Sequence, residues 1–174
     1  MTLTPDQVKW LKKMKITEYS VDAEGFVNVD RNVYIMNENL TSIPVKFGYV
    51  GGNFECWNND LSSLQGAPKE VGGDFWCSFN NLPSLQGAPR EVGGNFNCYH
   101  NKLTSLQGAP REVGGDFNCY NNKLTSLQGA PREVGGSFIC WCNNLTSLHC
   151  GNNKFTSEEP DHSFIKIDGD FVWE

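Results

Sequence analysis

The sequence contains no long apolar run, and this absence limits where the protein can reside. The N-terminal segment MTLTPDQVKWLKKMKI has no apolar stretch long enough for a secretory signal. No later segment approaches the length of apolar chain that crosses a bilayer. We therefore expect a cytoplasmic protein without a membrane partner.

An excess of positive charge is also missing. The 174 residues include 14 Lys and Arg against 20 Asp and Glu, which gives a net charge of -6 and a pI near 5.1. Domains that bind nucleic acid are usually basic, so the charge argues against a nucleic-acid partner. The cysteine count of 7 is odd, and most of these residues follow a repeat register. Free, buried thiols in a reducing compartment are therefore expected rather than disulfides.

Signals for catalysis and for metal binding are scarce. The sequence has 3 histidines, and no Ser or Cys motif suggests a nucleophile in contact with a base and an orienting group. The strongest candidate set for a metal ion is Cys140, Cys142, His149 and Cys150. Its spacing matches no familiar zinc signature. We therefore expect no catalytic residue, no metal site and no cofactor.

A repeat of 21 residues organises most of the chain, and LQGAPREVGGDFNCYNNKLTS is a representative copy. The unit Phe-x-Cys recurs at this spacing from Phe54 to Phe138, with a degenerate copy at Val33 and a truncated one at Cys150. Each full copy reads Phe-x-Cys-x-x-Asn-x-Leu-x-x-Leu, which matches the leucine-rich-repeat template. One copy cannot bury its own apolar face, so the copies must stack as a solenoid.

Each position of the repeat has a physical reason. Phe and Cys alternate with other residues, which is the period of a short strand with one buried face. The next conserved amide lies where the chain leaves the strand, so we expect it to be buried and bonded to backbone. These amides are Asn59, Asn80, Asn101, Asn122 and Asn143. Gly-Gly then lets the chain turn into the next strand, and the stacked strands form a parallel ladder with a concave sheet, with Cys77, Cys98 and Cys119 buried and reduced.

The two ends of the chain have the patterns of caps. Residues 4–7, Thr-Pro-Asp-Gln, predict a helix start with a capping box. The apolar residues that share one face of this helix are Val8, Leu11 and Met14. Hairpins are expected over residues 19–29 and, with Asp-Gly as the turn, over 164–173. The domain plan is therefore a helix-and-hairpin cap over 1–32, leucine-rich repeats over 33–157 and a hairpin cap over 158–174.

The outward strand positions differ between copies, whereas the Phe, Cys, Asn and Leu positions barely change. Repeat proteins usually vary where they bind and agree where they fold. Exposed Trp and Tyr flanked by Asp and Asn are typical of a protein-binding patch. The expected partner-binding residues are Trp57, Trp76, Tyr99, Tyr120, Trp141, Asp74, Asp116 and Glu55. Two other interpretations stay open: aromatic residues also suit strands, and a terminal cap could fold over them.

The segment LTSLQGAPREVGGDFNCYNNK resembles the bacterial subclass of leucine-rich repeats, found in secreted effectors that attack host signalling, some of them ubiquitin ligases. The chain is more similar to small repeat proteins encoded by tailed bacteriophages. Their pattern, GDF-x-C-x-x-N-x-LTSL-x-GAP-x-x-VGG, is nearly intact at 74–95, 95–116 and 116–137. The resemblance covers residues 33–157. Nothing beyond residue 157 is long enough for the catalytic domain of the ligases, so that activity is not carried over.

The resemblance implies a non-enzymatic protein-binding module. We expect a phage or bacterial factor that binds a host defence protein through its concave face and inhibits or diverts it. If phage-encoded, it would act in the host cytoplasm. The alternative is a protein that sequesters a small molecule or a nucleotide signal, with aromatic residues stacked on the base and Gly-Gly amides holding the phosphate. The acidic C-terminal segment and the scarcity of cations near the aromatic columns count against this alternative. The partner's identity and the oligomeric state stay open.

Overall fold

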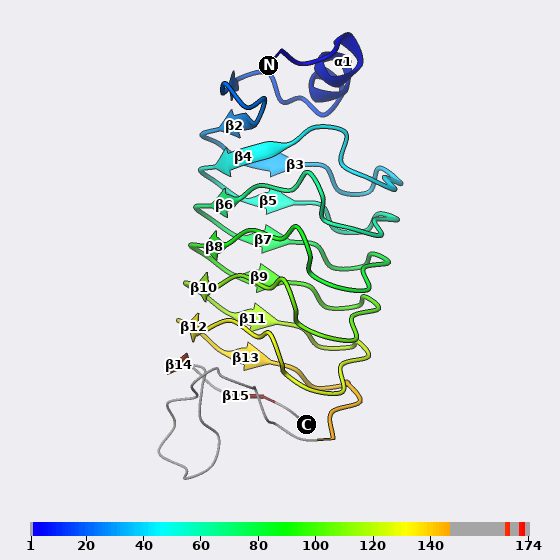
Figure 1. Cartoon of the computed structure of the whole chain (residues 1–174), viewed down its shortest axis with the longest axis vertical. Coiled ribbons are helices and arrows are strands. Elements are labelled where there is room, and N and C mark those ends of the chain that lie inside the picture. The colour runs from blue at the N-terminus through cyan, green and yellow to red at the C-terminus, as the bar shows by residue number, and fades with distance from the viewer. Residues whose placement is uncertain (1, 147–165, 168–170, 173–174) are drawn as a thin grey trace.

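The computed structural model describes residues 2–146, 166–167 and 171–172. It is a parallel β-solenoid of about five turns, stacked in a nearly straight column beneath one short N-terminal helix (Figure 1). Each turn contributes one short strand to each of two sheets. The expectation of a parallel ladder of stacked repeats is therefore confirmed, but a second ladder accompanies the expected one.

The expected ladder is the 7-stranded sheet, here called the Phe sheet. Its strands pair in parallel, and equivalent residues of successive repeats face one another, as Phe75 faces Phe96. The constant period of 21 residues therefore fixes the register. Its strands are β3 (Val33–Tyr34), β5 (Phe54–Glu55), β7 (Phe75–Trp76), β9 (Phe96–Asn97), β11 (Phe117–Asn118), β13 (Phe138–Ile139) and β15 (Phe171–Val172).

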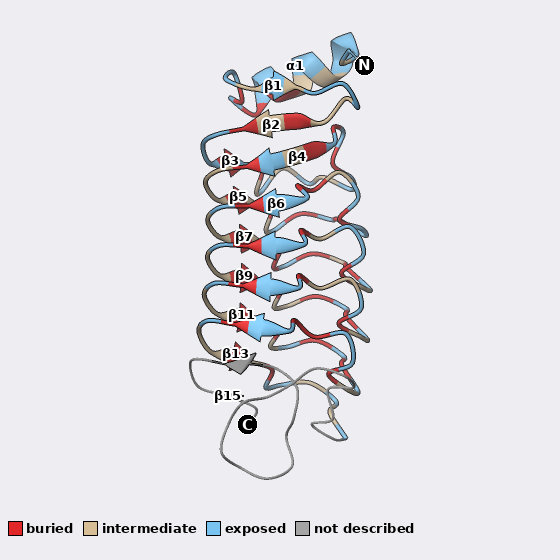
Figure 2. Ribbon diagram, turned by 60° about the vertical axis from the view of Figure 1, so that its left-hand side comes forward, coloured by how far each residue is buried: buried red, intermediate tan, exposed pale blue. Residues whose placement is uncertain are grey.

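The second ladder is an 8-stranded sheet, here called the Val sheet. In most turns a Glu-Val pair forms the strand, with valine buried and glutamate exposed (Figure 2). The sequence analysis treated this segment only as the approach to a Gly-Gly turn, because a strand of two residues is too short to show a period. Its strands are β1 (Ser20–Val21), β2 (Val27–Val29), β4 (Phe47–Val50), β6 (Glu70–Val71), β8 (Glu91–Val92), β10 (Glu112–Val113), β12 (Glu133–Val134) and β14 (Lys166–Ile167).

A column of phenylalanine rings fills the space between the sheets. The rings from Phe54 to Phe138 are fully buried and stack nearly parallel, with centroids 5.1 to 5.6 Å apart. The leucines of the repeat are buried behind them. The free thiols of Cys77, Cys98 and Cys119 lie in the same core with no exposed surface, which confirms their inward placement.

The predicted asparagine ladder is confirmed. In Asn101 the amide nitrogen donates to the carbonyl oxygens of Cys77 (3.0 Å) and Cys98 (3.1 Å). Its amide oxygen accepts from the backbone N–H of Leu82 at 3.1 Å. One buried side chain therefore joins two adjacent turns and satisfies backbone groups that the bend leaves without a strand partner. Equivalent bonds are made by Asn59, Asn80, Asn122 and Asn143.

Each Gly-Gly pair allows successive turns to approach closely. A Cβ atom added to Gly114 would overlap the carbonyl oxygen of Gly93 in the turn above, and one added to Gly93 would overlap that of Gly72. Backbone atoms cannot swing away as a flexible side chain would. Only glycine therefore fits this corner without shifting a neighbouring turn.

The N-terminal cap largely follows the prediction. Helix α1 (Pro5–Lys13) starts with the capping box between Thr4 and Gln7. Leu11 is fully buried, but Val8 is 44% exposed, so its place on the buried face was wrong. Moving three residues along a helix rotates the side chain by about 300° around the axis. Two such moves lead from Val8 to Met14, so these two side chains point about 120° apart. The hairpin of β1 and β2 is confirmed by the antiparallel register of Ser20 with Asn28.

The expected C-terminal hairpin over 164–173 is wrong. Strand β14 pairs in parallel with β12 in the Val sheet, whereas β15 pairs in parallel with β13 in the Phe sheet. Two strands in different sheets are not the arms of one hairpin. Instead, β14 adds a strand to the Val sheet and β15 adds one to the Phe sheet, and the sequence KIDGDFV at 166–172 matches EVGGSFI at 133–139. The expected turn residues at 168–169 and the truncated copy at Cys150 lie outside the described residues.

Candidate functional site

The variable columns of the repeat lie on the outer surface of the Phe sheet. Tyr99, Tyr120 and Trp141 line up on successive turns, and their rings stack with centroid separations of 5.1 and 4.7 Å. Tyr99 and Tyr120 are partly exposed and Trp141 is 37% exposed. The sequence therefore placed these three residues correctly on one outward stripe.

The stripe is interrupted above Tyr99. Ser78 occupies the column there, is fully buried, and donates its hydroxyl to the carbonyl oxygen of Asn97 at 3.1 Å. Trp57 lies beyond this gap, where its indole N–H donates to Glu55 at 3.1 Å. Trp76, one column across, is partly exposed, but its indole nitrogen is covered and has no hydrogen-bond partner in the described part of the chain.

A third column, which the sequence analysis did not single out, directly follows the aromatic stripe. All of its residues have a left-handed backbone, with φ between 51° and 58°. Asparagine tolerates this conformation, and histidine is also found there, but a bulky residue such as Phe79 is rare. The column consists of Asn37, Asn58, Phe79, His100, Asn121 and Cys142. The recurring asparagine was the available signal, because it is the residue that most often replaces glycine at such positions.

Phe79 and His100 complete a compact group of rings. Their own rings stack at 4.5 Å, and Phe79 also meets the ring of Tyr99 edge-on at 5.4 Å. His100 meets the ring of Tyr120 edge-on at 5.0 Å. Phe79 is 45% exposed, so the group forms a surface feature. We call Phe79, Tyr99, His100, Tyr120 and Trp141 the aromatic face.

The hydrogen bonds of His100 orient the hydroxyl of Tyr120. The amide nitrogen of Asn121 lies 2.6 Å from Nδ1 of His100, and Nε2 lies 2.7 Å from the Tyr120 hydroxyl oxygen. An amide nitrogen can only donate, so Nδ1 accepts, and in the neutral ring the proton resides on Nε2. Nε2–H then donates to Tyr120. The Tyr120 proton is left to point away from His100.

Asp74 and Asp116 have a structural role in addition to the predicted one. Each lies at the start of a Phe-sheet strand, where one carboxylate oxygen accepts the backbone N–H of the next turn, from Asn95 and Ser137, at 2.7 Å. Asn53 makes the same bond to Asp74. The residue type at this position varies in sequence, but a side-chain oxygen acceptor persists. Partner binding by Asp74 and Asp116 stays a prediction.

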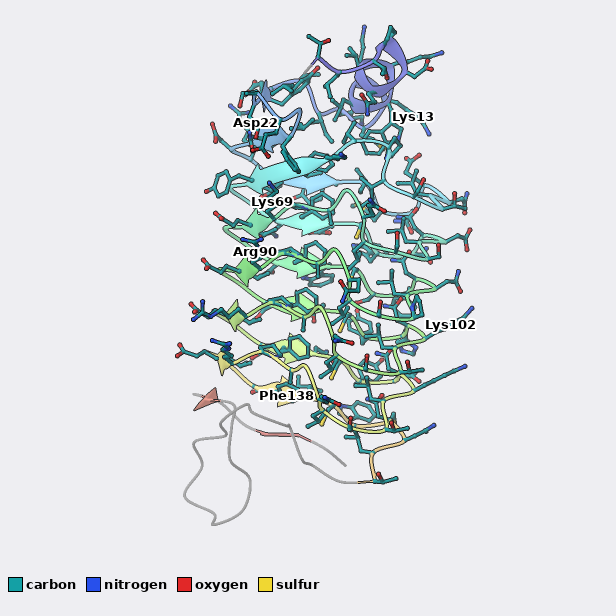
Figure 3. All side chains as sticks on the ribbon, in the orientation of Figure 1. Lys13, Asp22, Lys69, Arg90, Lys102 and Phe138 are labelled. Carbon is teal, nitrogen blue, oxygen red and sulfur yellow. The ribbon has the colours of Figure 1, made fainter. Side chains whose placement is uncertain are left out.

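A shallow hollow of about 460 Å³ borders the aromatic face. Phe79 and His100 line it together with charged and amide side chains of the adjacent column. Asp60 lies in the turn above Phe79, and Lys102 lies in the turn below and projects from the edge of the coil (Figure 3). The charge along this edge therefore changes sign from one end of the hollow to the other.

The opposite surface, outside the Val sheet, repeats almost without change. Its exposed strand positions are Glu70, Glu91, Glu112 and Glu133, in register on neighbouring strands. A parallel column of cations precedes them, made of Lys69, Arg90, Arg111 and Arg132. Lys69 and Arg90 are visible on this side in Figure 3. Only the pair Arg111–Glu112 comes within ion-pair range among the charges of these two columns, at 3.7 Å.

The buried thiols are poor candidates for chemistry. Burial raises the pKa of all five core cysteines, to about 12 at Cys140. A neutral thiol is neither a good nucleophile nor a metal ligand. Cys142 is exposed, but its candidate metal partners His149 and Cys150 lie outside the described residues. Over residues 2–146 no group of three or more His, Cys, Asp or Glu is placed to hold a metal ion.

Fold and surface together define a two-sheet β-solenoid with one constant face and one variable, aromatic face. Comparison with family models, with curated proteins and with solved structures gave no match. The only helix in the described part of the chain, α1, is too short and too polar to cross a membrane.

Proposed function

We propose that the protein is a non-enzymatic binding module of the leucine-rich-repeat type, and that its partner is a protein that docks on the aromatic face. The resemblance to phage and bacterial repeat proteins suggests the biological setting. In that setting a cytoplasmic phage or bacterial factor binds a host defence protein and inhibits or diverts it. The binding surface is the outer side of the Phe sheet. The sequence analysis expected this face to be concave, but the turns stack in a nearly straight column (Figure 1).

The observation that carries the proposal is the backbone of Phe79. It adopts a φ of 53° at a position where three other turns carry asparagine, at Asn37, Asn58 and Asn121. A bulky residue in this region costs about 1 to 3 kcal/mol, and such residues cluster at functional sites. The residue is 45% exposed, so burial in the core does not offset this cost. A requirement for an aromatic ring at the surface accounts for both the strained backbone of Phe79 and its exposure.

The arrangement of the rings favours a protein over a nucleotide. Tyr99, Tyr120 and Trp141 already stack on one another at 4.7 to 5.1 Å, so a planar base cannot enter between them without separating them. The three side chains are instead partly exposed at the surface. Tyrosine and tryptophan presented in this way are typical of binding hot spots.

Affinity capture from a bacterial lysate, compared between matched variants, tests the proposal. Phe79→Asn and His100→Asn restore the asparagine found in other turns and remove the rings. Each should weaken binding of the captured protein about 30-fold, because a hot-spot residue contributes about 2 kcal/mol. Glu112→Gln, on the opposite surface, should not change binding.

Equal capture by the wild type and by both aromatic variants would show that the aromatic face is not the binding surface. Loss of capture in the Glu112→Gln variant would move the interface to the Val sheet. A titration with a panel of nucleotides distinguishes protein binding from the alternative, nucleotide sequestration. A saturable signal there, abolished by Tyr99→Ala, would favour nucleotide sequestration.

A further inference from the structure

The charges beside the aromatic face have a symmetric arrangement centred on one turn. Asn81 lies in the same turn as Phe79 and is uncharged. One turn toward the N-terminus the equivalent position is Asp60, and one turn toward the C-terminus it is Lys102. Both charged side chains are exposed. The column therefore carries opposite charges at equal distances, about 4.8 Å along the stack, on either side of the Phe79 turn.

Two turns from the centre the column is no longer symmetric. The equivalent position two turns above is the uncharged Asn39, and two turns below it is Lys123. The nearby Glu38 belongs to the neighbouring column of Asn59 and is bound to Lys13 at 2.8 Å. Lys123 is exposed, and none of the ion pairs in the described part of the chain includes it.

A two-fold symmetry axis would pair Asp60 and Lys102 each with its opposite charge on a second copy. The axis lies in the plane of the aromatic face, runs parallel to the strands and passes through the turn that contains Phe79. It brings a second copy face to face with the first, keeps each column opposite itself and reverses the order of the turns. Asp60 then faces Lys102 of the second copy, and Lys102 faces Asp60 of the second copy. The interface is isologous, as in most homodimers.

The same axis places the exposed ring of Phe79 opposite its own counterpart. Trp57 comes opposite Tyr99 of the second copy, so an aromatic residue meets an aromatic residue on both sides of the axis. Ser78, which is fully buried in the same turn as Phe79, leaves no bulky side chain at the centre of the aromatic column. Shape and charge therefore both allow the two faces to meet.

We propose that the free protein forms a two-fold homodimer through its aromatic face, centred on Phe79 and held at its border by the Asp60–Lys102 pairs. The five turns from Asn39 to Lys123 span about 19 Å, so the patch is smaller than the standard interface of about 800 Å² per partner. The dimer is therefore weak and depends on protein concentration. The dimer does not rest on the proposed function. If both hold, self-association covers the site, and a partner must compete with the second copy.

Charge reversal tests the dimer without any other partner. In sedimentation velocity across a concentration series, the wild type should pass from monomer to dimer. Asp60→Lys and Lys102→Asp should each weaken the dimer at least about tenfold, because each sets two pairs of like charges against each other. An equimolar mixture of the two variants restores both attractions, and so does the double variant. Both are expected to dimerise as the wild type does.

Control variants separate local contact from net charge. Glu91→Lys and Arg111→Asp make the same charge changes on the Val-sheet surface and should leave the dimer unchanged. Circular dichroism checks that the exposed substitutions leave the fold intact. The proposal is overturned if the wild type stays monomeric at every concentration, or if mixing the two reversed variants restores no dimer. Neither outcome depends on capture of a host protein, so failure of the proposed function is distinguishable from failure of the dimer.

Discussion

The two broad surfaces of the solenoid follow the same 21-residue repeat but differ in what they keep constant. On the Val sheet the exposed position is glutamate in four successive turns, from Glu70 to Glu133. On the Phe sheet the exposed positions change from turn to turn, while the buried Phe and Cys do not. Stacking therefore requires a side-chain acceptor at the strand start, as at Asp74 and Asp116, but places little demand on the outer aromatic positions.

The constant surface also has a cost that the variable one avoids. Glutamates in register on neighbouring strands repel one another, and only the adjacent cations offset this repulsion. Such a charged surface keeps the short strands soluble and discourages association with other sheets. The variable surface instead carries exposed rings and mixed charges. One face is suited to remaining free and the other to being covered.

The largest expected loss of stability comes from the Gly-Gly corner that joins the Val sheet to the Phe sheet. Gly114→Ala places a methyl group against the carbonyl oxygen of Gly93, so two turns must separate. We expect a loss of about 3 kcal/mol in the free energy of unfolding, measured by urea denaturation. Gln107→Ala, at an exposed position, is the control and should be nearly neutral. A Gly114→Ala protein as stable as the wild type would show that adjacent turns can move apart without loss of stability.

The asparagine ladder is the next most sensitive element. Asn101→Ala leaves the carbonyl oxygens of Cys77 and Cys98 and the N–H of Leu82 without their partner. A cost of about 1 to 3 kcal/mol is expected from urea denaturation, since the site is buried. The same change at Asn143, which is partly exposed, should cost less because water can replace the lost bonds. Equal losses at both positions would contradict this dependence on burial.

The buried thiols predict a loss of stability at high pH. Burial raises the pKa of Cys98 and of Cys119 in the folded state. In the unfolded chain a thiol ionises with a pKa of about 8.5. Above that pH the unfolded chain binds fewer protons than the folded one, so stability falls as pH rises. Each thiol should contribute about 1.4 kcal/mol per pH unit in this range. Urea midpoints of wild type and Cys98→Ala between pH 8 and 10 measure it, and equal slopes would contradict the assignment.

The smallest effect on stability separates the two surfaces most directly. Phe79→Asn should raise the free energy of unfolding by about 1 kcal/mol, because asparagine tolerates the left-handed backbone that phenylalanine does not. The reverse change, Asn58→Phe, occupies the equivalent position one turn away and should lower stability by a similar amount. A gain in stability together with a loss of binding is the signature of a residue kept for function. Destabilisation by Phe79→Asn would show that its ring holds the fold.

The period of the sequence predicted the part of the fold that depends on identical residues meeting. Phe75 faces Phe96 because both occupy the same place in the repeat, and the asparagine ladder follows from the same spacing. The Val sheet escaped prediction because Glu-Val in two residues has no measurable alternation. Strands β14 and β15 were mistaken for the arms of one hairpin because the sequence Asp168-Gly169 between them is a strong hairpin-turn signal.

The candidate site was predicted only in part. Alternation along the strand gave Tyr99, Tyr120 and Trp141, since side chains flanking a buried Cys must point outward. It could not give Phe79 or His100, because their orientation depends on a left-handed φ that no hydrophobic pattern reveals. Nor could it separate Asp74 from a free surface residue, because the bond to Asn95 joins turns that are distant in sequence.

Strand pairing in identical register at every step also has an evolutionary consequence. β9 meets β11 as β7 meets β9, so a chain that loses or gains one whole repeat can still close its ladders. The copies LQGAPREVGGNFNC and LQGAPREVGGDFNC differ at one position, so one copy can be lost or gained without changing the residues that meet in the core. Such events would shorten or lengthen the aromatic face by whole turns. A change in copy number would thus alter the size of this surface before any point mutation alters a contact.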